Sequence, residues 1–194
     1  MTDKNDQLAI QKVINGNTNA FVFLVDKYKN MVFSLAFKMM KSREEAEEVS
    51  QDTFIKAFKN LSKFKGDAKF STWLYRIAYH TILDTLKKNK KHENTFEINE
   101  VTFNQIQSVE HILEGIARKE RSKVMDACLL KLAEDERAIL WMFYYDELSL
   151  KEILEVTSLS EANVKVKLHR ARKKLLTIVK ENVEPEMIAN YGRK

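Results

Sequence analysis

Glycine and proline are scarce in this sequence, and their scarcity restricts the fold more than any other feature. The 194 residues include four glycines and one proline, whereas 44% of all residues are hydrophobic. A β-sandwich, a barrel or a Rossmann sheet needs many tight turns, which glycine and proline supply most readily. The apolar content is also too high for a disordered chain. The composition therefore predicts a globular, mostly helical protein.

What the sequence lacks disfavours several kinds of chemistry. It has no G-x-x-x-x-G-K or G-x-G-x-x-G loop, so a nucleotide-dependent enzyme is not expected. The single cysteine, Cys128, cannot form an intramolecular disulfide, and its apolar neighbours favour a buried thiol over a reactive one. The four histidines lack the i, i+4 spacing of a metal site. We expect no catalytic residue, no metal and no cofactor.

The start of the chain and its charge also carry information. The first ten residues, MTDKNDQLAI, lack the basic and apolar regions of a signal peptide. No segment approaches the roughly 20 apolar residues that span a bilayer. We therefore expect a cytoplasmic protein with no direct membrane insertion. The net charge of +5 is only a weak indication of nucleic-acid binding.

Hydrophobic periodicity predicts three helices in the first half of the chain. Apolar residues within residues 21–39 recur at steps of three, four and seven, as on one face of a long helix. Ser42 and Glu45 form a capping box that opens a second helix, which continues to about residue 60. A third helix is predicted from residue 71 or 72 to about residue 89. Together these helices have enough apolar surface for one domain.

Residues 92–118 separate two parts of the chain. Between His92 and Gly115 there are five acidic residues and neither lysine nor arginine, which is typical of an acidic flexible linker. Helical periodicity resumes near Lys119, and three further helices follow residue 132. We predict an all-α fold of two small helical domains joined by this linker. The expected boundaries are residues 1–91, 92–118, 119–182 and a tail over 183–194.

The last two predicted helices form a helix-turn-helix. Ser149 and Glu152 make a second capping box, and Ser160 caps the final helix. One side of the final helix is apolar and is expected to pack on the helix before it; these residues are Val164, Leu168, Ala171 and Leu175. Between Glu161 and Glu181 there are seven lysines and arginines and no acidic residue.

The charge of the final helix favours DNA binding over the alternative, an ordinary solvated basic surface. Small and apolar residues at its start suit base edges, and the cations behind them suit phosphates. The candidate DNA-binding residues here are Ser160, Ala162, Asn163, Lys165, Val166, His169, Arg170 and Lys173.

The helix over residues 43–60 has a second candidate surface. Its inward positions are predicted to be Ala46, Ser50, Phe54, Ala57 and Leu61. Its outward side carries acidic residues around one apolar residue, the arrangement of a docking patch for a basic partner. The candidate binding residues are Glu48, Gln51, Asp52 and Ile55.

A basic, aromatic loop around Gly66 follows this helix. The next helix is expected to expose Tyr75, Arg76, Tyr79 and His80. Aromatic residues interleaved with cations suit unstacked bases and their phosphates. Phe70 and Trp73 are predicted to lie in the core instead, whereas for Phe64 core packing and base contact remain equally supported.

Two long segments resemble a known family. SREEAEEVSQDTFIKAFKNLSKFKGDAKFSTWLYRIAYHTILDTLKK resembles region 2 of the extracytoplasmic-function (ECF) branch of bacterial RNA polymerase sigma factors. KLAEDERAILWMFYYDELSLKEILEVTSLSEANVKVKLHRARKKLL resembles region 4 of the same family. The NVKVKLHRAR wording resembles members from the Bacteroidetes. The resemblance covers nearly the whole chain outside the linker and the tails.

The resemblance implies a transcription initiation factor that is not an enzyme. The acidic patch would bind the β′ clamp helices of core RNA polymerase, the linker would follow the RNA path, and region 4 would read the −35 element. The implied partners are core RNA polymerase through β′ and β, promoter DNA, and an anti-sigma factor or other regulatory protein. The residues implied at the −10 element are Phe64, Lys65, Gly66, Asp67, Lys69, Arg76, Tyr79 and His80.

Some positions depart from the family pattern, and two alternatives remain. Tyr79 and His80 replace the usual asparagine, and Ala133 stands where proline is common. Leu154 replaces an alanine and should push the two helices apart. Ser158 replaces a turn glycine, which makes a left-handed turn costlier. The alternatives are a free-standing helix-turn-helix regulator and a sigma-like adaptor recruited to DNA by another factor.

Overall fold

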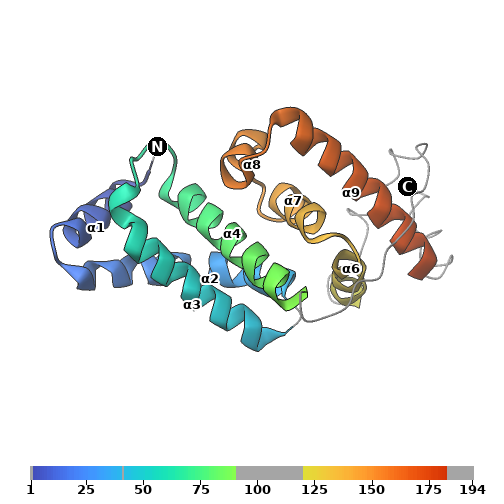
Figure 1. The fold of residues 1–194 in the computed structure, drawn as a ribbon, viewed down its shortest axis with the longest axis horizontal. Coiled ribbons are helices and arrows are strands. Elements are labelled where there is room, and N and C mark those ends of the chain that lie inside the picture. The colour runs from blue at the N-terminus through green and yellow to red at the C-terminus, as the bar shows by residue number, and fades with distance from the viewer. Residues whose placement is uncertain (1, 41, 91–119, 183–194) are drawn as a thin grey trace. The chain divides into compact units, whose positions relative to one another are not determined.

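The computed structural model describes residues 2–40, 42–90 and 120–182, and within these ranges every regular element is a helix (Figure 1). The predicted linker over 92–118 and the tail over 183–194 lie outside the described residues. The helices are α1 (Lys4–Ile14), α2 (Phe21–Met39), α3 (Arg43–Asn60), α4 (Phe70–Lys90), α6 (Glu120–Leu130), α7 (Glu134–Tyr144), α8 (Leu150–Thr157) and α9 (Glu161–Asn182). Short 3₁₀ turns, Thr18–Ala20 and Leu61–Lys63, precede α2 and follow α3.

Contacts among the described residues divide the chain into two compact units. The first contains α1 to α4 together with α8, and the second contains α6, α7 and α9. The helix over residues 150–157 falls in the first unit because α8 packs on α4. The expected domain boundaries stay a prediction.

The core of the first unit forms where α2, α3 and α4 pack on one another. The predicted bounds of these helices agree with the structure to within about two residues. The predicted cap is also present, because the Ser42 hydroxyl accepts a hydrogen bond from the Glu45 amide, 3.1 Å away. The fully buried side chains at the centre include Leu24, Leu35, Leu61, Leu74 and Ile82.

Sequence analysis missed α1, which a buried polar network holds on α2. The Asp6 side chain is only 2% exposed, and its carboxylate accepts hydrogen bonds from the Tyr28 hydroxyl at 2.6 Å and the Lys27 ammonium at 2.7 Å. Lys27 also donates to Asp3, whose carboxylate caps the helix through the Asn5 amide. Burial and the nearby Asp6 raise the pKa of Tyr28 to about 12, so its hydroxyl stays protonated and able to donate.

In the second unit, α9 packs on α7 and α6. The four residues expected on its apolar side, Val164, Leu168, Ala171 and Leu175, are all buried. Within this unit they pack against α7 and α6. The burial of this apolar side was predicted correctly, and its expected contact with the helix over residues 149–157 stays a prediction.

The turn after α8 places Ser158 in the left-handed conformation, which costs more for serine than for the glycine usual at this position. The capping box of Ser149 and Glu152 is present in both directions. Ser158 ends α8 in the left-handed region, with φ 59° and ψ 20°. The Ser160 hydroxyl then accepts a hydrogen bond from the Asn163 amide at 3.3 Å, as predicted.

We predict that Tyr28→Phe lowers the free energy of unfolding by about 1–3 kcal/mol, because a buried carboxylate loses one of its two donors. Thermal and urea unfolding of the full chain measure this change. Asp26→Asn on the same helix is the matched control, because Asp26 is 63% exposed and pairs only with an exposed lysine. That change should stay within about 0.5 kcal/mol. Equal effects of the two substitutions would show that the hydrogen bond from Tyr28 to the buried Asp6 carboxylate does not stabilise the fold.

We predict that Ser158→Gly raises the free energy of unfolding by about 0.5–1 kcal/mol. Removing the Cβ relieves the left-handed strain by more than the added entropy of the unfolded glycine costs. Lys151→Gly, within α8 and exposed, should instead lower it by about 0.5–1 kcal/mol. A lower free energy of unfolding in Ser158→Gly would contradict this prediction, because it would mean that the serine side chain stabilises the fold by more than its left-handed strain costs.

Candidate nucleic-acid interface

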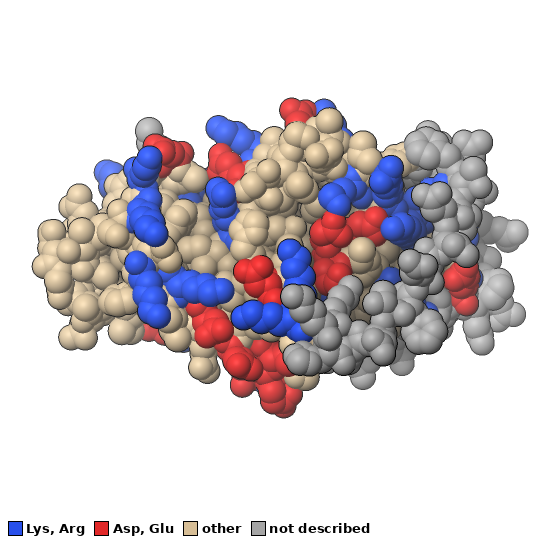
Figure 2. Space-filling model, viewed as in Figure 1, with Lys and Arg blue, Asp and Glu red and all other residues tan. Residues whose placement is uncertain are grey.

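The outward side of α3 carries the predicted acidic patch. All four predicted residues are exposed: Glu48, Gln51, Asp52 and Ile55. The exposed fraction of Ile55 is 50%. Figure 2 shows acidic side chains gathered near the lower edge of the molecule, over the start of α3. We call these four residues the α3 patch. It combines negative charge with a central apolar contact, which suits a partner surface that is basic around an apolar recess.

The inward side of α3 explains why the patch faces solvent. Ala46 and Ala57 are fully buried, and Val49 and Thr53, which sequence analysis did not assign, are buried beside them. The Thr53 hydroxyl donates to the Val49 carbonyl at 2.8 Å, so it can face the core without an unpaired polar group. The helix has one buried side, and its other side presents the patch.

An exposed aromatic residue, Phe58, lies one helical turn beyond Ile55 and was missed by sequence analysis. It keeps 39% of its surface exposed, and its ring packs edge-on against Phe21 at 5.1 Å. The i, i+3 spacing from Ile55 is the signal that could have found it. Phe58 extends the apolar part of the α3 patch.

The loop before α4 places a phenylalanine between core and solvent. Lys65, Gly66 and Asp67 are exposed, and Gly66 has φ 80°, which favours glycine. Phe64 is half-buried, and its ring lies 5.5 Å from Phe70 and 5.3 Å from Trp73. Phe70 is buried as predicted. Phe64 thus forms the edge of an aromatic cluster with part of its ring accessible.

On α4 the structure corrects two expected exposures. Arg76 and His80 are exposed as predicted, whereas Tyr75 and Tyr79 are buried, with 2% and 4% of their surface accessible. The reason is that α4 is covered on two sides, by α2 and α3 and by α8. Tyr79, which was predicted to contact the −10 element, is therefore a core residue of α4 in this structure.

The basic residue at the end of the loop is also engaged by α8. The Lys69 ammonium lies 2.9 Å from the Glu152 carboxylate. This ion pair and the cap hydrogen bond from Ser149 lower the pKa of Glu152 to about 2. Nearby, partial burial of its ring and the Arg76 cation lower the pKa of His80, so its imidazole is neutral at pH 7.

The structure leaves most of the residues predicted to bind DNA on α9 exposed. Ser160, Ala162, Asn163, Lys165, Val166 and Arg170 are exposed, and His169 and Lys173 are half-buried. The exposed fraction of Val166 is 46%. Lys165 forms an exposed ion pair with Glu161 at 2.6 Å, within the same helix. An apolar contact residue, polar groups and cations therefore share one side of this helix.

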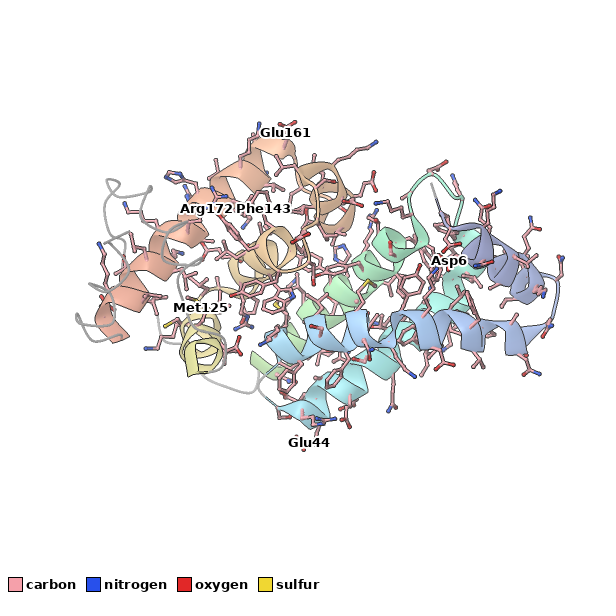
Figure 3. The ribbon with its side chains drawn as sticks, turned by 180° about the vertical axis from the view of Figure 1, so that it is seen from behind. Asp6, Glu44, Met125, Phe143, Glu161 and Arg172 are labelled. Atoms are coloured by element: carbon pink, nitrogen blue, oxygen red, sulfur yellow. The ribbon has the colours of Figure 1, made fainter. Side chains whose placement is uncertain are left out.

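Three other cations of α9 contact α7 and were not assigned by sequence analysis. Lys167 pairs with Asp135, and Lys174 reaches both oxygens of Glu136 at 2.9 and 3.1 Å. The Arg172 guanidinium lies 5.5 Å from the Phe143 ring centre and 5.3 Å from that of Tyr144. Figure 3 shows Arg172 and Phe143 beside each other. Each contact joins residues of different helices, so no local sequence pattern marks these cations as partners of α7.

Within residues 2–40, 42–90 and 120–182, no helix is long and apolar enough to cross a membrane. The same described ranges hold no group of three His, Cys, Asp or Glu residues that could bind a metal ion.

Two family models match the sequence. Sigma-70 region 2 matches residues 24–92, and Sigma-70, region 4 matches residues 122–175. The first covers α2 to α4 with the α3 patch and the aromatic loop, and the second runs from α6 into α9.

Similar proteins of known identity span nearly the whole chain. The ECF RNA polymerase sigma factor SigW of Bacillus subtilis is 32% identical over 173 residues, which cover 86% of this chain and 92% of SigW. The RNA polymerase sigma-H factor of Pseudomonas aeruginosa is 31% identical over 181 residues, covering 89% and 92% of the two chains.

Solved structures share the fold. CnrH, in complex with the cytosolic domain of CnrY, matches with a TM-score of 0.66 at 23% identity, over 92% of this chain and 99% of that one. The sigma factor RpoE of Bartonella quintana, in complex with the anti-sigma factor NepR, matches with a TM-score of 0.63 at 17% identity, over 84% and 98%.

We predict that Glu152→Gln destabilises the full chain by at most about 1 kcal/mol at pH 7, since Lys69 is largely solvated. A depressed carboxyl pKa contributes stability above the unfolded value of 4.5 and loses it as pH falls through about 2. The melting temperatures of variant and wild type should therefore converge between pH 4.5 and pH 2. A constant difference across that window would show that the ion pair is not its source.

Proposed function

This chain belongs to the extracytoplasmic-function family of RNA polymerase sigma factors, and we propose that it recruits core polymerase and recognises promoters through three separate surfaces. The surfaces are the α3 patch, the loop and helix around Gly66, and the outward side of α9. The observation that carries the proposal is that α3 and α9 each bury apolar residues on one side and expose charged residues on the other, with an exposed loop around Gly66 beside the half-buried Phe64. As in the family generally, the chain acts by binding, and we propose that the polymerase supplies the chemistry.

We propose that the α3 patch binds the β′ clamp helices of core polymerase. Its acidic residues Glu48 and Asp52 would meet basic residues, and Ile55 with Phe58 would fill an apolar recess. Solvent-exposed charges steer association and select the partner, while buried apolar contacts supply most of the affinity. The patch is therefore suited to a large, preformed partner surface.

We propose that the loop around Gly66 captures a base unpaired from the −10 element. The accessible part of Phe64 offers a stacking surface backed by Trp73, and Lys65, Lys69 and Arg76 would meet phosphates. Neutral His80 would act as a hydrogen-bonding group rather than a cation. Because Tyr79 is buried, its contribution would be to hold α4 in place.

We propose that α9 reads the −35 element in the major groove. Val166 and His169 would meet base edges, and Arg170 and Lys173 would meet phosphates. The region 4 unit would extend over residues 119–182 and the region 2 unit over residues 1–91, with residues 92–118 following the RNA path of the polymerase.

We also propose that an anti-sigma factor regulates this protein in the cytoplasm. Two proteins of the same fold were solved in complexes, CnrH with the cytosolic domain of CnrY and RpoE with the anti-sigma factor NepR. The NVKVKLHRAR segment supports an origin in the Bacteroidetes.

Polymerase binding tests the first surface. We predict that reversing Glu48 and Asp52 to lysine abolishes co-elution with core RNA polymerase at moderate salt, and leaves the melting temperature nearly unchanged because both side chains are exposed. Asp26→Lys with Glu181→Lys is the matched control, since it reverses two other exposed acidic residues and should bind normally. If the Glu48 and Asp52 double variant still co-elutes, core polymerase binds another surface.

Salt dependence separates phosphate contacts from base contacts on α9. Lys173→Ala should weaken binding of the polymerase complex about equally on all DNA sequences and reduce the salt slope by roughly one. His169→Ala should cost about 1–3 kcal/mol at one base step and leave the salt slope unchanged. Titration of two fragments that differ only in the upstream element measures both. A uniform loss of affinity in His169→Ala would exclude it as a base-reading residue.

A further inference from the structure

Three of the seven lysines and arginines between Glu161 and Glu181 bind α7 instead of facing the proposed DNA surface. We call their contacts the α7–α9 clamp. It consists of the pairs Lys167–Asp135, Lys174–Glu136 and Arg172 with Phe143 and Tyr144. All of these residues lie in the unit that contains α6, α7 and α9.

The clamp contacts α9 on both sides of its buried apolar residues, which form a stripe along the helix. At about 100° per residue, Lys167 and Lys174 lie roughly 80° to one side of the centre of that stripe, and Arg172 lies roughly 70° to the other side. The two lysines bind acidic residues in the first turn of α7, and the arginine contacts rings in its last turn. A rotation of α9 about its own axis, in either direction, would separate one edge from α7.

The lysine edge is held by a buried charge. The Glu136 side chain is 8% exposed, and both its oxygens accept from Lys174. A buried carboxylate without its cation is strongly unfavourable, so Lys174 cannot leave easily to meet a phosphate. Burial would raise the pKa of Asp135, but Lys167 outweighs it and keeps that carboxyl ionised.

The arginine edge is held by aromatic rings. The Arg172 guanidinium lies over two rings of α7, and its Nε atom is buried. Cation–π attraction increases when the cation is shielded from water. Arg172 is thus a packing cation, unlike Arg170 two residues earlier, which is exposed.

A small rotation of α9 would have a large effect on base contacts. Side chains extend about 5–6 Å from a helix axis, so a roll of about 20° displaces their ends by about 2 Å. A hydrogen bond tolerates only a few tenths of an ångström. Base reading therefore needs a fixed rotation of α9. The buried apolar residues determine which side of α9 faces the core, and the clamp adds directional contacts on both edges of that side, which oppose a small roll.

We propose that the α7–α9 clamp sets the rotation of α9, and thereby decides which outward side chains reach base edges, without contacting DNA itself. Asp135, Glu136 and the three clamped cations are positioning residues for promoter recognition. The inference rests on the proposed −35 reading by α9. It assigns part of sequence discrimination to acidic residues that a purely electrostatic account of DNA binding would count as unfavourable.

The test uses the full chain bound to core RNA polymerase. The probes are a duplex that the wild-type complex selects from randomised DNA, and the same duplex with its upstream element scrambled. The readouts are the ratio of the two affinities and the slope of affinity against salt. We expect Glu136→Gln to reduce the ratio about ten-fold, the effect of one misplaced base contact, although this change removes a negative charge and so favours DNA binding in general. We expect Lys174→Gln to reduce the ratio similarly and to leave the salt slope unchanged.

Matched variants distinguish positioning from phosphate contact and from misfolding. Arg170→Gln should lower the salt slope by about one with the ratio unchanged. The swap of Glu136→Lys with Lys174→Glu restores opposite charges and should recover at least part of the ratio. Helicity and melting temperature are measured for every variant, and Lys174→Gln, at a side chain that is 57% exposed, keeps the test valid if changes at Glu136 disturb folding.

Two results would overturn the inference, and they differ from each other. If Lys174→Gln lowers the salt slope and keeps the ratio, Lys174 contacts phosphate, the clamp is not a positioning device, and −35 reading by α9 stands. If the wild-type complex does not distinguish the two duplexes, −35 reading itself is wrong and the clamp has no recognition to position.

Discussion

The apolar side of α3 packs on α2 and α4, and this packing determines which side chains of α3 meet the solvent. The same constraint acts on α9, whose apolar side is buried against α6 and α7. Because a helix has a fixed period, burying one stripe fixes the direction of every other side chain. The exposed acidic side of α3 and the exposed basic side of α9 are thus consequences of how the cores are built.

Local signals made much of this arrangement predictable. Ser42, Ser149 and Ser160 cap helices where the sequence pattern places them, because capping depends on residues three positions apart. The apolar stripe of α9 follows from a period that the sequence displays directly. The exposed positions of the α3 patch could be predicted for the same reason.

Features that depend on distant partners were not predictable from these signals. Tyr75 and Tyr79 were expected at the surface, and their burial follows from the packing of α2, α3 and α8 around α4. The helix α1 was missed because its anchor, Asp6, is polar in sequence and acquires its role from Lys27 and Tyr28. Similarly, a cation on α9 gives no local indication of whether it will meet an acid, an aromatic ring or solvent.

The central claim is that this chain directs core RNA polymerase to promoters by reading two DNA elements. Transcription from a supercoiled library with randomised upstream sequence tests it most directly, with purified core polymerase in the presence and absence of the full chain. The account predicts transcripts that depend on the chain and begin at a fixed distance from a recurring two-part motif. Transcripts that are independent of the chain, or that share no upstream motif, would contradict it.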